Sequence, residues 1–137
     1  MPHVIKIQIT SEPEMLRIVR AMVDEVCLLA GFTSMESSKV VLAVDEACSN
    51  VIKHAYRGKV GQLILITAGI FDDRLEIEIK DHGEKVDPQK IKSRKLSEIR
   101  PGGLGVHLMK TVMDEVKFVQ GMESGNCLLM IKKIAKE

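Results

Sequence analysis

The chain has 137 residues, of which 45% are hydrophobic and 28% charged, and this balance predicts one folded domain over residues 1–137. A net charge of +1 and an aromatic content of 3% argue against nucleic acid as a partner, because such binding uses basic surface and stacking side chains. The sequence contains no apolar segment long enough for a membrane span, and its first residues do not resemble a signal peptide. We therefore expect a cytoplasmic protein that binds neither nucleic acid nor membrane.

The first 31 residues contain signals for one strand and one helix. Residues 4–9 alternate apolar and polar side chains, which predicts a strand. Ser11 precedes Glu14 by three positions, with Pro13 between them, and this spacing predicts a capping box at the start of a helix. Gly31 predicts where that helix ends.

A second helix and a hairpin follow. Thr33 and Glu36 have the spacing of another capping box, and the helix that they open is predicted to run to about Tyr56. The segments "LILITAGIF" and "RLEIEIKD" have period-two patterns and flank Asp72 and Asp73, which predicts two paired strands. The apolar side chains of the second strand should be buried and its charged side chains solvated.

The last third of the chain combines a charged loop with a helix and a closing hairpin. Residues 84–101 have no periodicity and are rich in charge. A helix is predicted from about Leu104 to Glu115, followed by strands "VKFV" and "CLLMIKKI" on either side of a turn at Gly121–Gly125. The order of elements predicts an α+β sandwich with its helices on one face of a sheet.

Three short segments contain residue types suited to nucleotide chemistry. On the second helix, Glu46, Asn50 and His54 are four residues apart, so they share a stripe beside the apolar face. Such a stripe can line the edge of a cleft, although a solvated helix face produces the same spacing.

The other two segments are a strand end and a glycine-rich helix start. Asp81 ends a strand and Gly83 follows it, so the carboxylate can accept a hydrogen bond from an amine, although an ordinary Asp-x-Gly turn explains the pair equally well. Gly103 and Gly105 lead into a helix, where free backbone N–H groups can bind an anion, or the glycines can simply form a turn. The chain lacks the lysine motif of a P-loop.

Together and in this order, "DEACSNVIKHAY", "DHG" and "GGLGVHLM" resemble the sequence boxes of Bergerat-type ATPases. The "HAY" ending, "GGLGVHLMKTVMDEVKF" and "GNCLLMIKK" are similar to the anti-sigma-factor serine-protein kinases within that group. The resemblance implies a Bergerat-type α+β sandwich with a mixed, mainly antiparallel sheet. It further implies ATP and Mg²⁺ as ligands, a homodimer, a sigma factor as partner, and an anti-anti-sigma antagonist protein that is phosphorylated on serine.

The resemblance also implies roles for individual residues. Glu46 corresponds to the general base, Asn50 to the Mg²⁺ ligand, and Asp81 to the carboxylate that recognises adenine. Gly83 corresponds to a glycine that allows close approach, whereas His54 is expected to be structural. The residues that correspond to the phosphate-binding segment are Gly103, Leu104 and Gly105.

Two features depart from the family pattern. Lys85 occupies the position of a second glycine in the first glycine box. Arg100 is the expected cation near the γ-phosphate, with Lys92, Arg94 and Lys95 as competing positions. The sequence therefore supports two hypotheses: a serine-protein kinase that acts as an anti-sigma factor, or a non-catalytic ATP-binding module that switches partner affinity.

Overall fold

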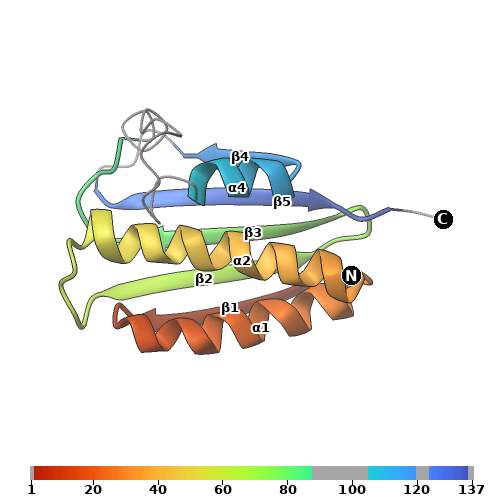
Figure 1. Ribbon diagram of the computed structural model, residues 1–137, viewed down its shortest axis with the longest axis horizontal. Helices are drawn as coiled ribbons and strands as arrows, with labels where there is room; N and C mark the ends of the chain where they lie inside the picture. The colour runs from red at the N-terminus through yellow and green to blue at the C-terminus, as the bar shows by residue number, and fades with distance from the viewer. Residues whose placement is uncertain (1, 88–104, 120–123, 136–137) are drawn as a thin grey trace.

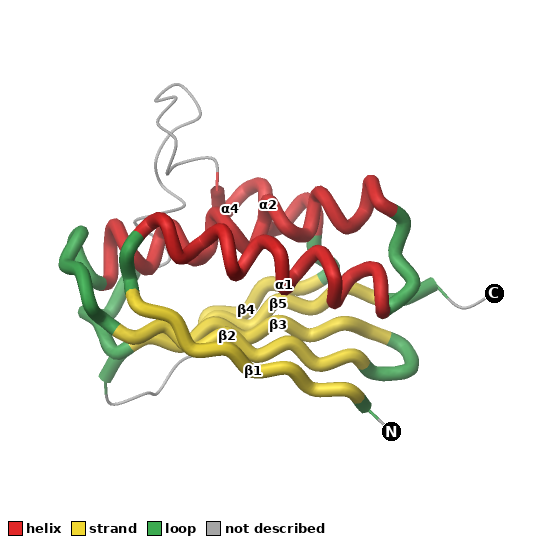
Figure 2. The backbone as a smooth tube through the Cα atoms, turned by 90° about the horizontal axis from the view of Figure 1, so that it is seen from below, coloured by secondary structure: helices red, strands yellow, loops and turns green. Residues whose placement is uncertain are grey.

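The computed structural model describes residues 2–87, 105–119 and 124–135. Its helices lie side by side over one face of a sheet, so the described chain forms two layers (Figures 1 and 2). This arrangement confirms the predicted α+β sandwich. The elements are β1 (His3–Thr10), the 3₁₀ turn η1 (Pro13–Met15), α1 (Leu16–Leu29), α2 (Ser34–Asn50), the π-helical turn η2 (Val51–Ala55), β2 (Leu63–Ile70), β3 (Arg74–Asp81), α4 (Gly105–Val112), β4 (Glu115–Phe118) and β5 (Asn126–Lys133).

The sheet has the strand order β1-β2-β3-β5-β4, and all four pairings between the described strands are antiparallel. The two predicted hairpins, β2–β3 and β4–β5, are therefore confirmed. In the β3–β5 pairing, Asp81 lies opposite Asn126. The last residue of β3 and the first residue of β5 thus meet at the same end of the sheet, where side chains from both strands can form one site.

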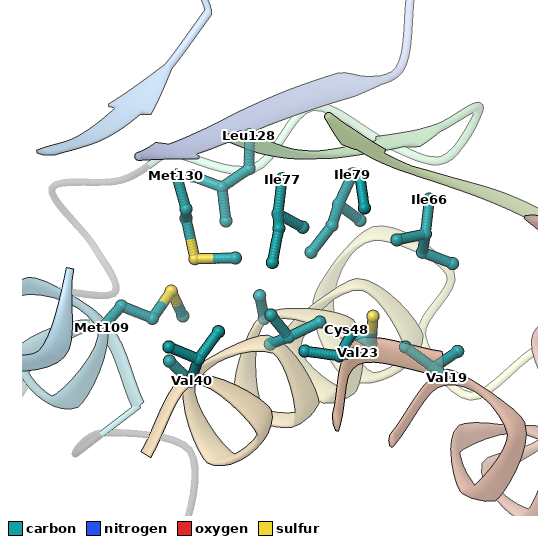
Figure 3. Packing of buried hydrophobic residues seen from close by; sticks show 14 of the residues in the cluster. Val19, Val23, Val40, Cys48, Ile66, Ile77, Ile79, Met109, Leu128 and Met130 are labelled. Atoms are coloured by element: carbon teal, nitrogen blue, oxygen red, sulfur yellow. The ribbon is translucent and has the colours of Figure 1, made fainter. Parts of the chain in front are cut away.

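The core lies between the sheet and the helices (Figure 3). Leu75, Ile77 and Ile79 of β3 are fully or almost fully buried, as the period-two pattern predicts. Val23 of α1 and Val40 of α2 pack toward the sheet and are also fully buried. Because the apolar residues of both layers face each other, the polar side chains of the same helices lie at the surface or near the ends of the sheet.

The two predicted capping boxes have different outcomes. The second is confirmed, because the Thr33 hydroxyl accepts from the backbone N–H of Glu36 at 3.2 Å and the Glu36 carboxylate accepts from that of Thr33 at 3.0 Å. The first is wrong: the Ser11 hydroxyl donates to the Lys59 carbonyl at 2.7 Å and accepts from the N–H of Gln62 at 3.0 Å. Ser11 therefore binds a loop that is distant in sequence, although its local spacing predicted a hydrogen bond at the helix start.

The ends of the three helices agree with the sequence-based predictions only in part. Gly31 has φ +95° and follows Ala30, the C-cap residue of α1, as expected for a helix stop. The second helix reaches the predicted length, but its last turn, Val51–Ala55, is π-helical. The helix that was predicted to run to Glu115 ends at Val112, because the N–H of Asp114 donates to Ile131 of β5 at 2.8 Å and Glu115 already begins β4.

The cysteines Cys27, Cys48 and Cys127 are free and buried. Burial raises the pKa of Cys48 to about 12, and that of Cys27 to about 11. These thiols therefore act as small apolar side chains. Within the described residues, no helix has both the length and the apolar character needed to cross a bilayer.

Candidate nucleotide-binding site

A pocket opens where the C-terminal part of α2 meets the ends of β3 and β5. Its walls are mainly apolar and contain three polar side chains, those of Asn50, Asp81 and Asn126. Such an environment, apolar with a few converging polar groups, is typical of small-molecule sites. The pocket is lined by Ala47, Asn50, Val51, Ala55, Ile79, Asp81, Val86, Met109, Phe118, Asn126, Cys127 and Leu128.

Asn50 is the last α-helical residue of α2, and only 8% of it is exposed. Its Oδ1 atom is buried and has no hydrogen-bond partner among the described residues. A buried polar atom that stays without a partner costs about 1–3 kcal/mol, and such atoms are explained by a bound water, ion or ligand or by a functional role of the site. The π-helical turn begins at the next residue, and such turns are frequent at functional sites.

The Asn50 amide oxygen fits a magnesium ion that is bound together with phosphates. Mg²⁺ prefers oxygen donors and commonly takes only one or two protein ligands, with water and phosphate oxygens completing the shell. An amide oxygen that has no competing hydrogen bond can serve as such a ligand. The Asn50 oxygen is therefore chemically suited to Mg²⁺, and its assignment as the ligand stays a prediction.

Glu46 lies one helical turn before Asn50 and is partly buried. Burial raises the pKa of its carboxyl group, the neighbouring Asp45 raises it further, and Lys53 opposes the shift. Asp45 itself faces α1, where it forms an ion pair with Arg20 at 2.7 Å. A carboxylate with a raised pKa accepts a proton more readily near neutral pH, which suits a general base.

His54 does not line the pocket with Asn50, although both were expected on one stripe. His54 lies in the π-helical turn that follows α2. The expectation that His54 is structural stays a prediction.

Asp81 is the last residue of β3, and only 2% of it is exposed. Its Oδ1 atom accepts hydrogen bonds from the N–H of Gly83 at 2.8 Å and from the Asn126 amide at 3.0 Å. Burial raises the pKa of the Asp81 carboxyl group, and these two hydrogen bonds partly offset that effect. The carboxylate is thus held at the pocket wall as an acceptor for an amine.

Because Gly83 has no side chain, another part of the protein's own backbone can approach it closely. A Cβ atom at this position would lie 2.5 Å from the backbone oxygen of Ala55. The same oxygen accepts from the N–H of Glu84 at 2.9 Å, and the Tyr56 hydroxyl accepts from that of His82 at 2.8 Å. The glycine therefore lets the loop after β3 pack against η2, which fixes the position of Asp81.

Gly105 is the first residue of α4, so its N–H belongs to the helix-start groups that have no partner within the helix. Met109, one turn later, lines the pocket, which places this helix beside Asn50 and Asp81. The other expected residues of this segment, Arg100, Gly103 and Leu104, lie outside the described residues. Their assignment to phosphate binding stays a prediction.

Asn126, at the start of β5, is a pocket residue that the sequence did not single out. Its amide nitrogen donates to Asp81 at 3.0 Å and to the Glu84 carbonyl at 2.8 Å. Its amide oxygen accepts from the N–H of Val86 at 2.9 Å. The period-two pattern of this strand could have identified Asn126, because it puts this polar residue on the same face as the buried Leu128.

Comparison with known proteins agrees with this geometry. The sequence profile of the histidine kinase-like ATPase domain matches residues 9–132. The chain belongs to this family.

Within the family, the chain is 36% identical to the serine-protein kinase RsbW of Bacillus velezensis and 35% identical to that of Bacillus subtilis. Each alignment covers 97% of this chain and 87% of the relative. The structure of the RsbU and RsbW domains of Rv1364c from Mycobacterium tuberculosis superposes with a TM-score of 0.65 at 16% identity, over 95% of this chain and 31% of that one. The resemblance inferred from the three motifs is thereby confirmed.

Proposed function

We propose that this protein is an ATP-dependent serine-protein kinase and anti-sigma factor, which phosphorylates a small anti-anti-sigma antagonist protein. The observation that carries the proposal is the buried, unpartnered Oδ1 atom of Asn50 in the same pocket as the Asp81 carboxylate. The family fold and the relatives named serine-protein kinase support it.

In this proposal the adenine base lies among the apolar pocket walls, with its amino group donating to Asp81. Asn50 holds a magnesium ion through Oδ1, and the ion supplies charge neutralisation for the triphosphate. Gly103, Leu104 and Gly105 contribute backbone N–H groups to the phosphates. Arg100 adds positive charge near the transferred group.

The transfer step needs little covalent chemistry from the protein. The oxygen of the acceptor serine forms a bond to the γ-phosphorus while the bond from that phosphorus to the β–γ bridging oxygen breaks, and ADP leaves. The serine proton passes to the Glu46 carboxylate. Because burial raises the Glu46 pKa, transfer should decline on acidification at a higher pH than with an exposed glutamate.

The partners and setting of the reaction are part of the proposal. We place the protein in the cytoplasm, where ATP is available, and we expect it to form a homodimer and to bind a sigma factor when its antagonist is phosphorylated. Support comes from the relatives named RsbW, which cover nearly the whole chain. Co-purification with sigma factors of the same genome would identify the partner.

Labelled ATP and candidate antagonist proteins from the same genome provide the test. We expect magnesium-dependent labelling of one antagonist on serine, and Glu46→Gln should reduce the transfer rate by about 100-fold or more while ATP affinity changes little. Asp45→Asn is the matched control, because it removes a neighbouring carboxylate that pairs with Arg20. ATP binding without transfer to any antagonist would instead identify a non-catalytic ATP-binding module.

A further inference from the structure

The side chain of Asn126 connects three parts of the pocket wall. It comes from the first residue of β5, and it reaches the last residue of β3 and the segment that follows β3. Both amide protons are used, one on the Asp81 carboxylate at 3.0 Å and one on the Glu84 carbonyl at 2.8 Å. The amide oxygen accepts from the N–H of Val86 at 2.9 Å.

The orientation of this amide is determined by its partners. An ionised carboxylate and a backbone carbonyl only accept hydrogen bonds, whereas the N–H of Val86 only donates. The amide nitrogen of Asn126 must therefore face Asp81 and Glu84, and its oxygen must face Val86. No other standard side chain of this length offers two donors and one acceptor in this planar arrangement.

The backbone on the N-terminal side of Asn126 packs closely against Asp81. Gly125, with φ +72°, packs its backbone against the Asp81 carbonyl, and a Cβ atom there would overlap that oxygen. On the other side the N–H of Gly83 binds the same carboxylate oxygen that Asn126 binds. Without the amide, one of these two hydrogen bonds to Oδ1 is lost and the wall residue Val86 loses its link to β5.

We propose that Asn126 is a positioning residue for nucleotide selection, which holds the Asp81 carboxylate and the Val86 wall in the arrangement that accepts adenine. The inference rests on the proposed ATP-binding function. Asn126 acts through Asp81 and Val86, so its loss should change which base is bound as well as how tightly. A residue that only stabilised the fold would leave the choice between bases unchanged.

The test is a comparison of Mg·ATP and Mg·GTP binding by calorimetry for the parent and for Asn126→Leu, which has a similar shape and none of the three hydrogen bonds. We expect ATP affinity to fall about tenfold and GTP affinity to change less, because a hydrogen bond to a charged group is lost. Ser37→Ala is the control: it removes a buried hydroxyl that donates to Asp24 at 2.6 Å near the opposite end of α2, outside the pocket lining, so it should leave the ATP-to-GTP ratio unchanged.

A double-mutant cycle with Asp81→Asn separates positioning from general stability. If Asn126 acts through Asp81, adding Asn126→Leu to Asp81→Asn should weaken ATP binding less than about twofold further. Asn126→Ser makes the same comparison with a smaller change, should the leucine variant not fold. An unchanged ATP-to-GTP ratio, or fully additive losses, would overturn the inference while ATP binding by the parent stands. Failure of the parent to bind Mg·ATP would overturn the proposed function itself and this inference with it.

Discussion

Replacing Asn50 by leucine should stabilise the protein without nucleotide and abolish its magnesium-dependent binding of ATP. Leucine has the same branching as asparagine at Cγ, and the surrounding pocket is mainly apolar. The substitution removes the buried Oδ1 atom that has no hydrogen-bond partner among the described residues. Stability and ligand binding should therefore change in opposite directions at this one position.

The size of the effect follows from the cost of an unsatisfied buried polar group, which is about 1–3 kcal/mol. Leucine also favours the helix over asparagine by a few tenths of a kcal/mol, roughly. For a chain of this length, 1 kcal/mol corresponds to a shift in Tm of about 4 °C. We expect Asn50→Leu to raise the Tm of the nucleotide-free protein by about 4 °C or more.

Differential scanning calorimetry of the nucleotide-free protein measures the shift, and titration with ATP in the presence and absence of Mg²⁺ measures binding. Asn50→Asp is the matched variant: it keeps oxygen ligands for the ion but places a charge at a site that is only 8% exposed. It should lower the Tm and retain part of the magnesium dependence. A lower Tm for Asn50→Leu, or ATP binding that still depends on Mg²⁺, would refute the reasoning about Oδ1.

Three further substitutions test other parts of the site. Asp81→Asn should weaken ATP binding and reduce the preference for ATP over GTP, because the amide group both donates and accepts hydrogen bonds whereas the carboxylate only accepts. Competition binding measures the ATP-to-GTP ratio of affinities. An unchanged ratio would argue against Asp81 as the residue that recognises the base. Gly83→Ala should lower the free energy of unfolding by about 1–3 kcal/mol in a denaturant titration, because its Cβ would lie 2.5 Å from the Ala55 oxygen. Arg100→Ala should reduce phosphoryl transfer far more than ATP affinity in single-turnover assays, and transfer at the parental rate would make Arg94 the next residue to test.

How far the sequence predicts this site differs from residue to residue. Asn50 and Asp81 were identified because their segments, taken together and in order, resemble the family motifs, although each local pattern alone fits an ordinary helix face or turn. The structure brings both residues to one pocket. Asn126 was missed because it lies at a strand start after a turn, where asparagine is common for local reasons. Its role becomes visible only when β5 pairs with β3 and the amide meets Asp81.

By itself, the sequence determined the order and type of most elements, since hydrophobic period, capping spacing and turn residues are local properties of the chain. It also determined the family, because three motifs in a fixed order are specific together.

Tertiary structure decided features that depend on partners distant along the chain. Ser11 binds the loop near Lys59 in place of its own helix, and strand pairing ends α4 before Glu115. Gly83 is required by the backbone of Ala55, which lies at the end of another element. These contacts form only when separate elements pack together, so local sequence patterns contain no information about them.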